Sequence, residues 1–414
     1  MQDRPIPSSK LAPMHKQPTL VQRFGLLAAG VCLVALVIGS IAIVFFTNRH
    51  NTHGPSPVGT SHPTATARPT LVVYHPGKSL GNLVYSTTFS DEDIFGLAWS
   101  PDSTRLGVAT VSTSQSWVAT TGKGVVNYGL GGPRNMSTTS VPTVIWSPDG
   151  KLVAVTGEGL GVDVYDARTG VLLKTYPDNG QATTVAKTGG YLSARVTLGC
   201  GGGAAGAIAW SPDGHLMATA FYCSYDHAVQ VWNTSTGHLV HTYTGHATDV
   251  GSLSWSADGT YIASSDGDSI QVWNALTGQR IYDFEENTTC TPPAAVAWSP
   301  DGIALAYLNC DQVRVVDPFT GQLLSTHTGP HDSSGFLSAL AWSPDGKYMA
   351  SAGDHIEVWR VATGRTYYTF TKNASPVERL AWSPDGKYIA SANASPPPFS
   401  TVPSTITIQV WSAE

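Results

Sequence analysis

The sequence has few charged residues, and no stretch of it reads as a long amphipathic helix: Asp, Glu, Lys and Arg together make up only 13% of the chain. A protein built from surface helices would need charged residues along their outer faces. The chain instead contains 42 glycines, 27 prolines, 12 tryptophans and 16 tyrosines. Aromatic residues favour strands, whereas Gly and Pro favour the turns between them. The composition therefore predicts a turn-rich β protein.

The chain also lacks a basic surface, since its net charge is −6. Its N-terminal segment is the exception, with four basic residues and one acidic residue: Arg4, Lys10, Lys16, Arg23 and Asp3. The remainder is therefore more acidic than the whole. Because nucleic-acid binding needs a basic footprint, we expect no nucleic-acid partner. The acidity is typical of a surface that keeps a protein soluble.

One long hydrophobic run is present, and it contains no charged residue from Phe24 to Thr47. About 23 residues at roughly 1.5 Å each can cross the hydrocarbon core of a bilayer, so we predict a transmembrane helix over residues 25–47. The alternative is a cleaved signal peptide, whose apolar region spans about 7–15 residues and precedes a small-residue cleavage site. This run is longer and is followed by no such site, which favours an uncleaved anchor.

The basic residues before the span predict the orientation of the chain. Residues 1–24 form an expected cytoplasmic tail, and everything after the span is expected outside the cytoplasm, as in a single-pass cell-membrane protein. Residues 48–79 are rich in Pro, Thr, Ser and His and are expected to form an extended linker. The linker histidines are possible metal ligands, but their irregular spacing favours a solvated linker.

One phrase, Trp-Ser-Pro-Asp-Gly or a close variant, recurs along the rest of the chain. Its seven tryptophans are Trp99, Trp146, Trp210, Trp255, Trp298, Trp342 and Trp382. The spacing between successive tryptophans is 40 to 64 residues. A period in this range is typical of propellers and solenoids.

Each repeat unit reads as four strands. An alternating apolar segment such as 295–298 precedes the phrase, the phrase itself is a turn, and a second apolar segment such as 261–263 follows. A third strand comes next, as at 229–233, and a Thr-Gly turn leads to a fourth, as at 279–284. Four antiparallel strands make one propeller blade. We therefore predict an all-β fold, a seven-bladed β-propeller over residues 80–414.

These phrases, repeated in fixed order, resemble the WD40-repeat family over roughly residues 80–414. The fourth unit is the most similar, from Gly245-His246 to Trp273, whereas units one, two and five lack the usual third-strand Trp or place it loosely. In this family, a His before the first strand and an Asp near the second-to-third turn join the blade by hydrogen bonds. The resemblance thus implies blade-stitching residues in units four and six: His246, Asp268, Trp273, His331, Asp354 and Trp359.

The two ends of the propeller region predict how the ring closes. The chain stops at the third strand of the seventh unit, so that blade lacks a fourth strand. Residues 80–89 precede the first repeat and have strand character. We expect them to complete the seventh blade and so to hide an edge that would otherwise aggregate.

Cys32 lies in the predicted span. The other four cysteines flank the hairpins of units three and five at their open ends. The two ends of an antiparallel hairpin lie side by side, within disulfide reach. We therefore predict the disulfides Cys200–Cys223 and Cys290–Cys310, which require an oxidising compartment. Four buried free thiols are the alternative.

The sequence contains none of the common catalytic motifs, such as a zinc-protease helix, a nucleophile elbow or a P-loop. Residues 201–206 match G-x-G-x-x-G, but they run into a strand and not into a phosphate-binding helix, so we interpret them as a loop. The aspartates of the repeated turns stand alone, whereas Ca²⁺ needs 6–8 oxygen ligands. We predict no catalytic residue, no cofactor and no bound metal.

Surplus sequence is concentrated in four segments: residues 178–206, 286–294, 328–337 and 394–400. All four precede first strands or connect second to third strands, which places them on one face of a propeller. Because loops on a rigid scaffold carry function, we expect the binding surface there. The candidate binding residues are Tyr191, Tyr222, Tyr225 and Phe399, each of which could instead serve local packing.

We expect a non-catalytic, membrane-tethered interaction or scaffold module that presents this face to a protein, peptide or glycan. One alternative is an extracytoplasmic hydrolase or lyase with its site on the loop-bearing face or in the central channel. Another is a purely structural cell-surface protein. A cluster of carboxylates with perturbed pKa values around one pocket would favour the enzyme, whereas an aromatic-bearing face would favour binding.

Overall fold

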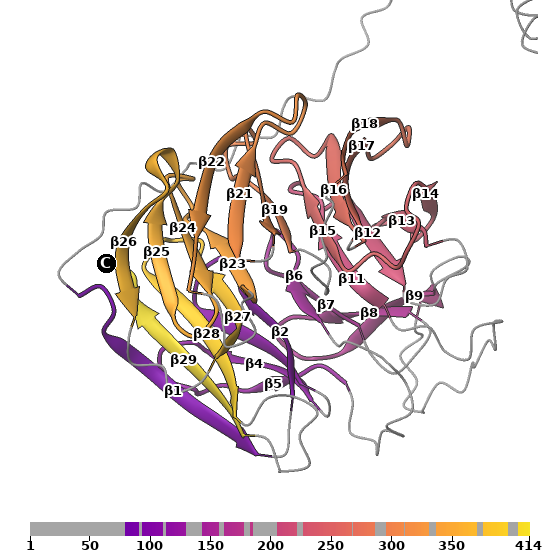
Figure 1. Cartoon of the computed structure of the whole chain (residues 1–414). Coiled ribbons are helices and arrows are strands. Elements are labelled where there is room, and N and C mark those ends of the chain that lie inside the picture. Colours follow the sequence, from indigo (N-terminus) through magenta and orange to yellow (C-terminus); the bar gives the residue numbers. More distant parts are fainter. Residues whose placement is uncertain are drawn as a thin grey trace, which may run out of the picture. The chain divides into compact units, whose positions relative to one another are not determined.

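The computed structural model of this protein describes residues 79–90, 93–110, 113–129, 143–156, 161–177, 183–184, 205–221, 227–266, 268–285, 295–309, 311–330, 337–370, 376–395 and 405–414. Their strands form seven separate antiparallel sheets, each of which is one blade (Figure 1). Blade one comprises β2 (Ile94–Trp99), β3 (Arg105–Thr110), β4 (Ser114–Val118) and β5 (Val126–Asn127). Blade two comprises β6 (Val144–Trp146), β7 (Leu152–Thr156), β8 (Gly161–Asp166), β9 (Leu172–Pro177) and the short β10 (Thr183–Thr184).

The next three blades have four strands each. Blade three comprises β11 (Ala205–Trp210), β12 (Leu216–Phe221), β13 (Val229–Asn233) and β14 (Leu239–Tyr243). Blade four comprises β15 (Ser252–Trp255), β16 (Tyr261–Ser265), β17 (Ser269–Asn274) and β18 (Arg280–Glu285). Blade five comprises β19 (Val296–Trp298), β20 (Leu305–Asn309), β21 (Gln312–Val316) and β22 (Leu323–Thr328).

The last two blades complete the set. Blade six comprises β23 (Ala339–Trp342), β24 (Tyr348–Ala352), β25 (Ile356–Arg360) and β26 (Arg365–Phe370), with the 3₁₀ turn η1 (Val361–Thr363) before β26. Blade seven comprises β27 (Val377–Trp382), β28 (Tyr388–Ser395), β29 (Thr405–Ser412) and β1 (Leu83–Ser90). The first strands of adjacent blades contact one another, and β27 of blade seven contacts β2 of blade one. The seven sheets therefore form a closed ring, which confirms the predicted seven-bladed propeller.

Closure of the ring depends on β1, the strand nearest the N-terminus among the described residues. It pairs antiparallel with β29, and the register places Phe89 opposite Ile406. Two backbone hydrogen bonds of 2.8 Å extend this pairing, from Gly81 N–H to the Ser412 carbonyl and from Ser412 N–H to the Asn82 carbonyl. The prediction that residues 80–89 complete blade seven is therefore confirmed.

The hydrophobic core consists of layers between blades. Seven clusters of buried apolar residues are present in the described part of the chain, one at each junction of adjacent blades. At the junction of blades three and four, for example, Val231 packs in the same cluster as Trp273. Strands stacked face to face bury both faces, which explains why their sequences are apolar at most positions. Each blade is thus stabilised by its two neighbours.

The repeated Ser-Pro-Asp-Gly turns share one hydrogen-bond pattern. In all seven, the Ser hydroxyl donates to the Asp carboxylate over 2.5 to 2.8 Å. The Gly adopts a positive φ in six of them, as at Gly214 with φ 73°. Ser103 holds this position in the first turn with φ 60°, and its hydroxyl accepts a hydrogen bond of 2.9 Å from the Asp385 N–H of blade seven. The predicted turns are confirmed.

Three segment boundaries differ from the sequence-based prediction. The insertion predicted to begin at Ala394 starts later, because β28 continues to Ser395, which pairs with Thr405. Part of the surplus 178–206 segment is the fifth strand β10, which pairs with β9. Leu337, at the end of another predicted loop, is buried in the core between blades five and six.

Several predictions fall on residues that the structure does not describe. These are the tail at residues 1–24, the span at 25–47, the linker at 48–79 except its last residue, and the cysteines Cys200, Cys223, Cys290 and Cys310. Within the described ranges, no helix is long and apolar enough to cross a membrane. The membrane anchor and the two disulfides remain predictions.

Candidate functional site

One face of the propeller receives all the connections that the sequence singled out. The first and third strands of each blade begin on this face, and the second and fourth strands end on it, because neighbouring strands are antiparallel. We call it the loop face; the Ser-Pro-Asp-Gly turns lie on the opposite face. The candidate binding residues Tyr191, Tyr222, Tyr225 and Phe399 lie outside the described residues, so their place on this face remains a prediction.

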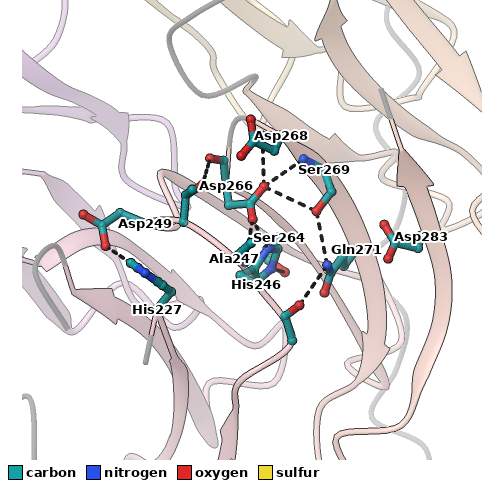
Figure 2. Close-up of polar contacts among 12 residues, drawn as sticks. His227, His246, Ala247, Asp249, Ser264, Asp266, Asp268, Ser269, Gln271 and Asp283 are labelled. Atoms are coloured by element: carbon teal, nitrogen blue, oxygen red, sulfur yellow. Dashed lines mark hydrogen bonds and ion pairs between the residues drawn. The ribbon is translucent and has the colours of Figure 1, made fainter. Parts of the chain in front are cut away.

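A buried polar network runs inward from the loop face in blade four (Figure 2). His246 Nδ1 lies 3.1 Å from Asp266 Oδ2, and the two side chains are 0% and 1% exposed. The other ring nitrogen, Nε2, lies 2.6 Å from the Ser264 hydroxyl. Trp273 Nε1–H donates to the same hydroxyl over 2.9 Å. The network therefore links the segment before β15 to the second and third strands.

Asp266, and not Asp268, is the carboxylate partner of His246, which corrects the sequence-based assignment. The Asp266 Oδ1 atom accepts backbone hydrogen bonds of 3.0 Å from Asp268 and 2.8 Å from Ser269. Asp268 thus contributes its N–H to the turn. Burial by itself raises the pKa of Asp266, but contact with His246 and the two N–H donors outweigh it and hold that pKa well below its usual range.

A second histidine–aspartate pair lies nearby but is half-exposed. His227 Nδ1 is 2.8 Å from Asp249 Oδ1, and each side chain is 34% exposed. His227 precedes β13 of blade three and Asp249 precedes β15 of blade four, so the pair bridges two blades on the loop face (Figure 2). His227 has a φ of 47°, which is uncommon for a residue with a side chain. Such strain is often found at functional sites.

The stitch implied for blade six remains a prediction, because His331 lies outside the described residues. The Asp354 N–H donates to the Pro330 carbonyl over 3.1 Å. Trp359 stacks on His327 of blade five, with ring centroids 4.6 Å apart and an interplanar angle of 17°. His327 Nε2 lies 3.0 Å from Glu357 Oε2, and this contact lowers the pKa of Glu357 despite partial burial.

This contact belongs to a pattern that the sequence analysis missed. The fourth strand of a blade carries an aromatic or His ring that lies against the third strand of the next blade. The ring pairs and their centroid distances are Phe89–Trp117 at 6.0 Å, Tyr176–Trp232 at 5.6 Å, Tyr243–Trp273 at 4.3 Å, His327–Trp359 at 4.6 Å and Phe370–Trp411 at 5.7 Å. We call these contacts the ring belt. The signal available in the sequence was a ring near the end of each fourth strand.

The described residues bring together no group of three His, Cys, Asp or Glu side chains that could hold a metal ion. Two carboxylates in this part of the chain have a raised pKa, chiefly because they are buried: Asp163 on β8 and Glu378 on β27. They lie in blades two and seven, which are not adjacent. These two groups therefore do not form the acid–base pair that hydrolysis or elimination would need.

Comparison with known proteins identifies the repeats. Four segments, residues 197–233, 237–274, 321–356 and 364–395, match the family profile described as WD domain, G-beta repeat. The chain therefore contains WD40 repeats, as its sequence predicted. The segments 237–274 and 364–395 each start before a fourth strand and continue into the next blade. One sequence repeat thus spans two blades and crosses the ring belt.

Two relatives show how far the likeness extends. Rat (Rattus norvegicus) apoptotic protease-activating factor 1 is 30% identical over 162 residues, which are 38% of this chain. The chain spans only 13% of the length of that relative. One chain of a crystal structure titled mitotic checkpoint complex superposes with a TM-score of 0.61 at 19% identity, covering 89% of this chain and 99% of that one. This second likeness shows the fold.

Proposed function

We propose that this protein is a non-catalytic scaffold that holds a protein partner on the loop face, beside the His227–Asp249 pair. This half-exposed contact between a histidine and an aspartate is the observation that carries the proposal. It lies on the loop face between blades three and four, and blade three both follows the longest surplus segment and contains the short 222–226 connection. Rigid scaffolds commonly place their binding residues at such positions.

The packing beneath this pair supports a preformed surface. The buried His246–Asp266 contact and the Ser264 hydroxyl fix the segment before β15, which also carries Asp249. Thr248 adds a hydrogen bond of 2.7 Å from its hydroxyl to the Asp266 carbonyl. A partner that meets a preformed surface loses less conformational freedom in binding, which favours affinity. The structure titled mitotic checkpoint complex also favours a protein as the partner, since the similar chain belongs to a complex.

We further propose that residues 25–47 tether the scaffold to the cell membrane, with residues 1–24 in the cytoplasm and the propeller outside it. The uncharged run from Phe24 to Thr47 and the basic residues before it support this arrangement. The 48–79 linker would then connect the membrane anchor to the propeller.

Affinity capture with the full-length protein, solubilised from membranes, tests the binding proposal. His227→Asn removes the ion pair but keeps a residue that tolerates a positive φ, so the fold should be retained. Lys151→Ala is the matched control, because it removes one member of an exposed ion pair on the opposite face, where Lys151 lies 3.0 Å from Asp149.

The expected result is a protein retained by the wild type and by Lys151→Ala, and lost or weakened with His227→Asn. A variant in which the 185–204 segment is shortened should also lose the captured protein. A partner that all four proteins capture equally would contradict the placement on the loop face. A peptide or glycan in place of a protein would correct the partner class. A turnover of added esters or glycosides that disappears with Glu378→Gln would favour the hydrolase alternative.

A further inference from the structure

Blade five lacks the tryptophan that its neighbours share. Strand register assigns equivalent positions: Trp232 pairs with Met217, Trp273 with Ile262, Trp359 with Met349 and Trp411 with Ile389. In blade five, the same position on the third strand is Val316, which pairs with Leu305. The indole that fills the space between two blades at these four positions is therefore replaced here by an isopropyl group.

A pocket lies at this place. Its volume is about 440 Å³, within the range typical of ligand sites. Val316 and Tyr307 lie on its blade-five side, and Tyr282 and Phe284 of β18 on its blade-four side. The inner end of the pocket is closed by packed side chains: Val316 and Tyr307 are each only 2% exposed, and the Tyr307 ring centroid lies 6.0 Å from that of Phe284. The pocket is open at its outer end, where Leu323 is 53% exposed.

The lining of the pocket favours a flat aromatic ring. Tyr282 and Phe284 present two rings whose centroids lie 4.5 Å apart. Arg314 of β21 also lines the pocket, two residues before Val316 and on the same face of its strand. A guanidinium plane can stack on an aromatic ring while its edge keeps other partners. The two rings of the blade-four wall therefore resemble the fourth-strand rings that an indole contacts in other blades, and Arg314 offers a guanidinium for a cation–π contact with a bound ring; Asp283 and Gly321 complete the lining.

We infer that this pocket binds the side chain of a tryptophan supplied by another polypeptide. The chain has 12 tryptophans, and each lies in a described strand of the propeller, so none of its remaining segments can provide the ring. The site lies on the circumference of the propeller, between β18 and β22, and is independent of the proposed loop-face function. The pocket would let the propeller bind a second partner that does not compete for the loop face.

The test measures binding of N-acetyl-L-tryptophanamide to the full-length protein by ligand-observed NMR and isothermal titration. A single indole should bind with a dissociation constant on the order of 0.1–1 mM. N-acetyl-L-leucinamide, which has no ring, should bind at least about 10-fold more weakly, because it loses the ring contacts. Arg314→Lys should weaken the binding of the tryptophan probe by roughly 2- to 30-fold, because the compact ammonium group of Lys cannot stack on the indole as the planar guanidinium does.

Val316→Trp supplies the missing indole from within and should abolish binding while the thermal unfolding transition persists. Leu276→Trp is the matched control: it adds a tryptophan at a 59% exposed site on a blade-four turn, and binding should stay unchanged. If Val316→Trp fails to fold, Leu323→Trp covers the mouth of the pocket from the surface and should block binding in the same way.

Three results would overturn the inference. One is the absence of saturable binding by the wild type up to several millimolar probe. Another is equal binding of the leucine and tryptophan probes. The third is binding that survives both a folded Val316→Trp and Leu323→Trp.

Discussion

The phenol ring of Tyr243 and the indole ring of Trp273 lie parallel, with an interplanar angle of 4° and centroids 4.3 Å apart. Tyr243 ends the fourth strand of blade three, and Trp273 lies on the third strand of blade four. The Tyr243 hydroxyl also donates to Gln271 Oε1 over 2.6 Å, and burial raises the pKa of Tyr243 to about 12. One side chain thus joins two blades through a ring contact and a hydrogen bond.

Two substitutions of Tyr243 should separate these contributions. Tyr243→Phe keeps the ring stack but removes the hydroxyl, and it should reduce the free energy of unfolding by about 1–2 kcal/mol. Tyr243→Leu removes the stack as well and should reduce it by roughly a further 1 kcal/mol. Urea denaturation followed by tryptophan fluorescence measures both. Equal stability of the two variants would show that the stack contributes nothing; Leu276→Ala, on an exposed turn, serves as the control.

Asp266→Asn should make the protein less stable at neutral pH, by roughly 3–5 kcal/mol, because it breaks a buried contact with His246. The folded state lowers the pKa of Asp266, so its contribution to stability is present above the ordinary carboxyl pKa of about 4 and is lost as the pH falls below it. The difference between wild type and variant should therefore shrink between pH 7 and pH 3. Denaturant unfolding at several pH values measures it.

Asp268→Asn is the matched control for this prediction. Asp268 supplies its backbone N–H to Asp266, and the substitution keeps that donor. Its unfolding free energy should stay within about 0.5 kcal/mol of the wild type at every pH. A larger effect than that of Asp266→Asn would restore the assignment that the sequence suggested.

Removal of β1 should open the ring. A chain that begins at residue 91 leaves β29 as an unpaired edge strand and removes the Phe89–Trp117 contact, so we expect a lower melting temperature and self-association. A chain that begins at residue 79 keeps every described strand and should remain monodisperse. Size-exclusion chromatography and thermal unfolding compare the two. Similar behaviour of both would show that β1 is dispensable for closure.

The two predicted disulfides, Cys200–Cys223 and Cys290–Cys310, can be tested by thiol alkylation of the denatured full-length protein. Four cysteines should become reactive only after reduction, while Cys32 reacts before it. Replacing both members of one pair by Ser should reduce stability by about 3 kcal/mol. Five reactive thiols before reduction would contradict both the disulfides and the oxidising compartment that they require.

The repeated turns, the strands of each blade and the closure of the ring could be predicted from the sequence. The seven Trp-Ser-Pro-Asp-Gly phrases determine where each hairpin turns, because Pro restricts φ and the Gly that follows accepts a positive φ. The alternation of apolar residues determines the strands, and the missing fourth strand of blade seven determines how the ring closes. The turns and strands depend on residues near one another in the chain, and the closure follows from the number of strands in the last repeat.

The side-chain contacts that join separate strands, within a blade and between blades, were decided only by the tertiary structure. Asp266 and Asp268 both lie at the second-to-third turn, and the backbone path of that turn decides which carboxylate faces His246. The ring belt and the pocket beside Val316 depend on how the fourth strand of one blade lies against the next. A repeat pattern specifies the strands within a blade, but the space between two blades depends on side chains from both. Valine at the position of a tryptophan leaves a pocket only when blades four and five are packed together.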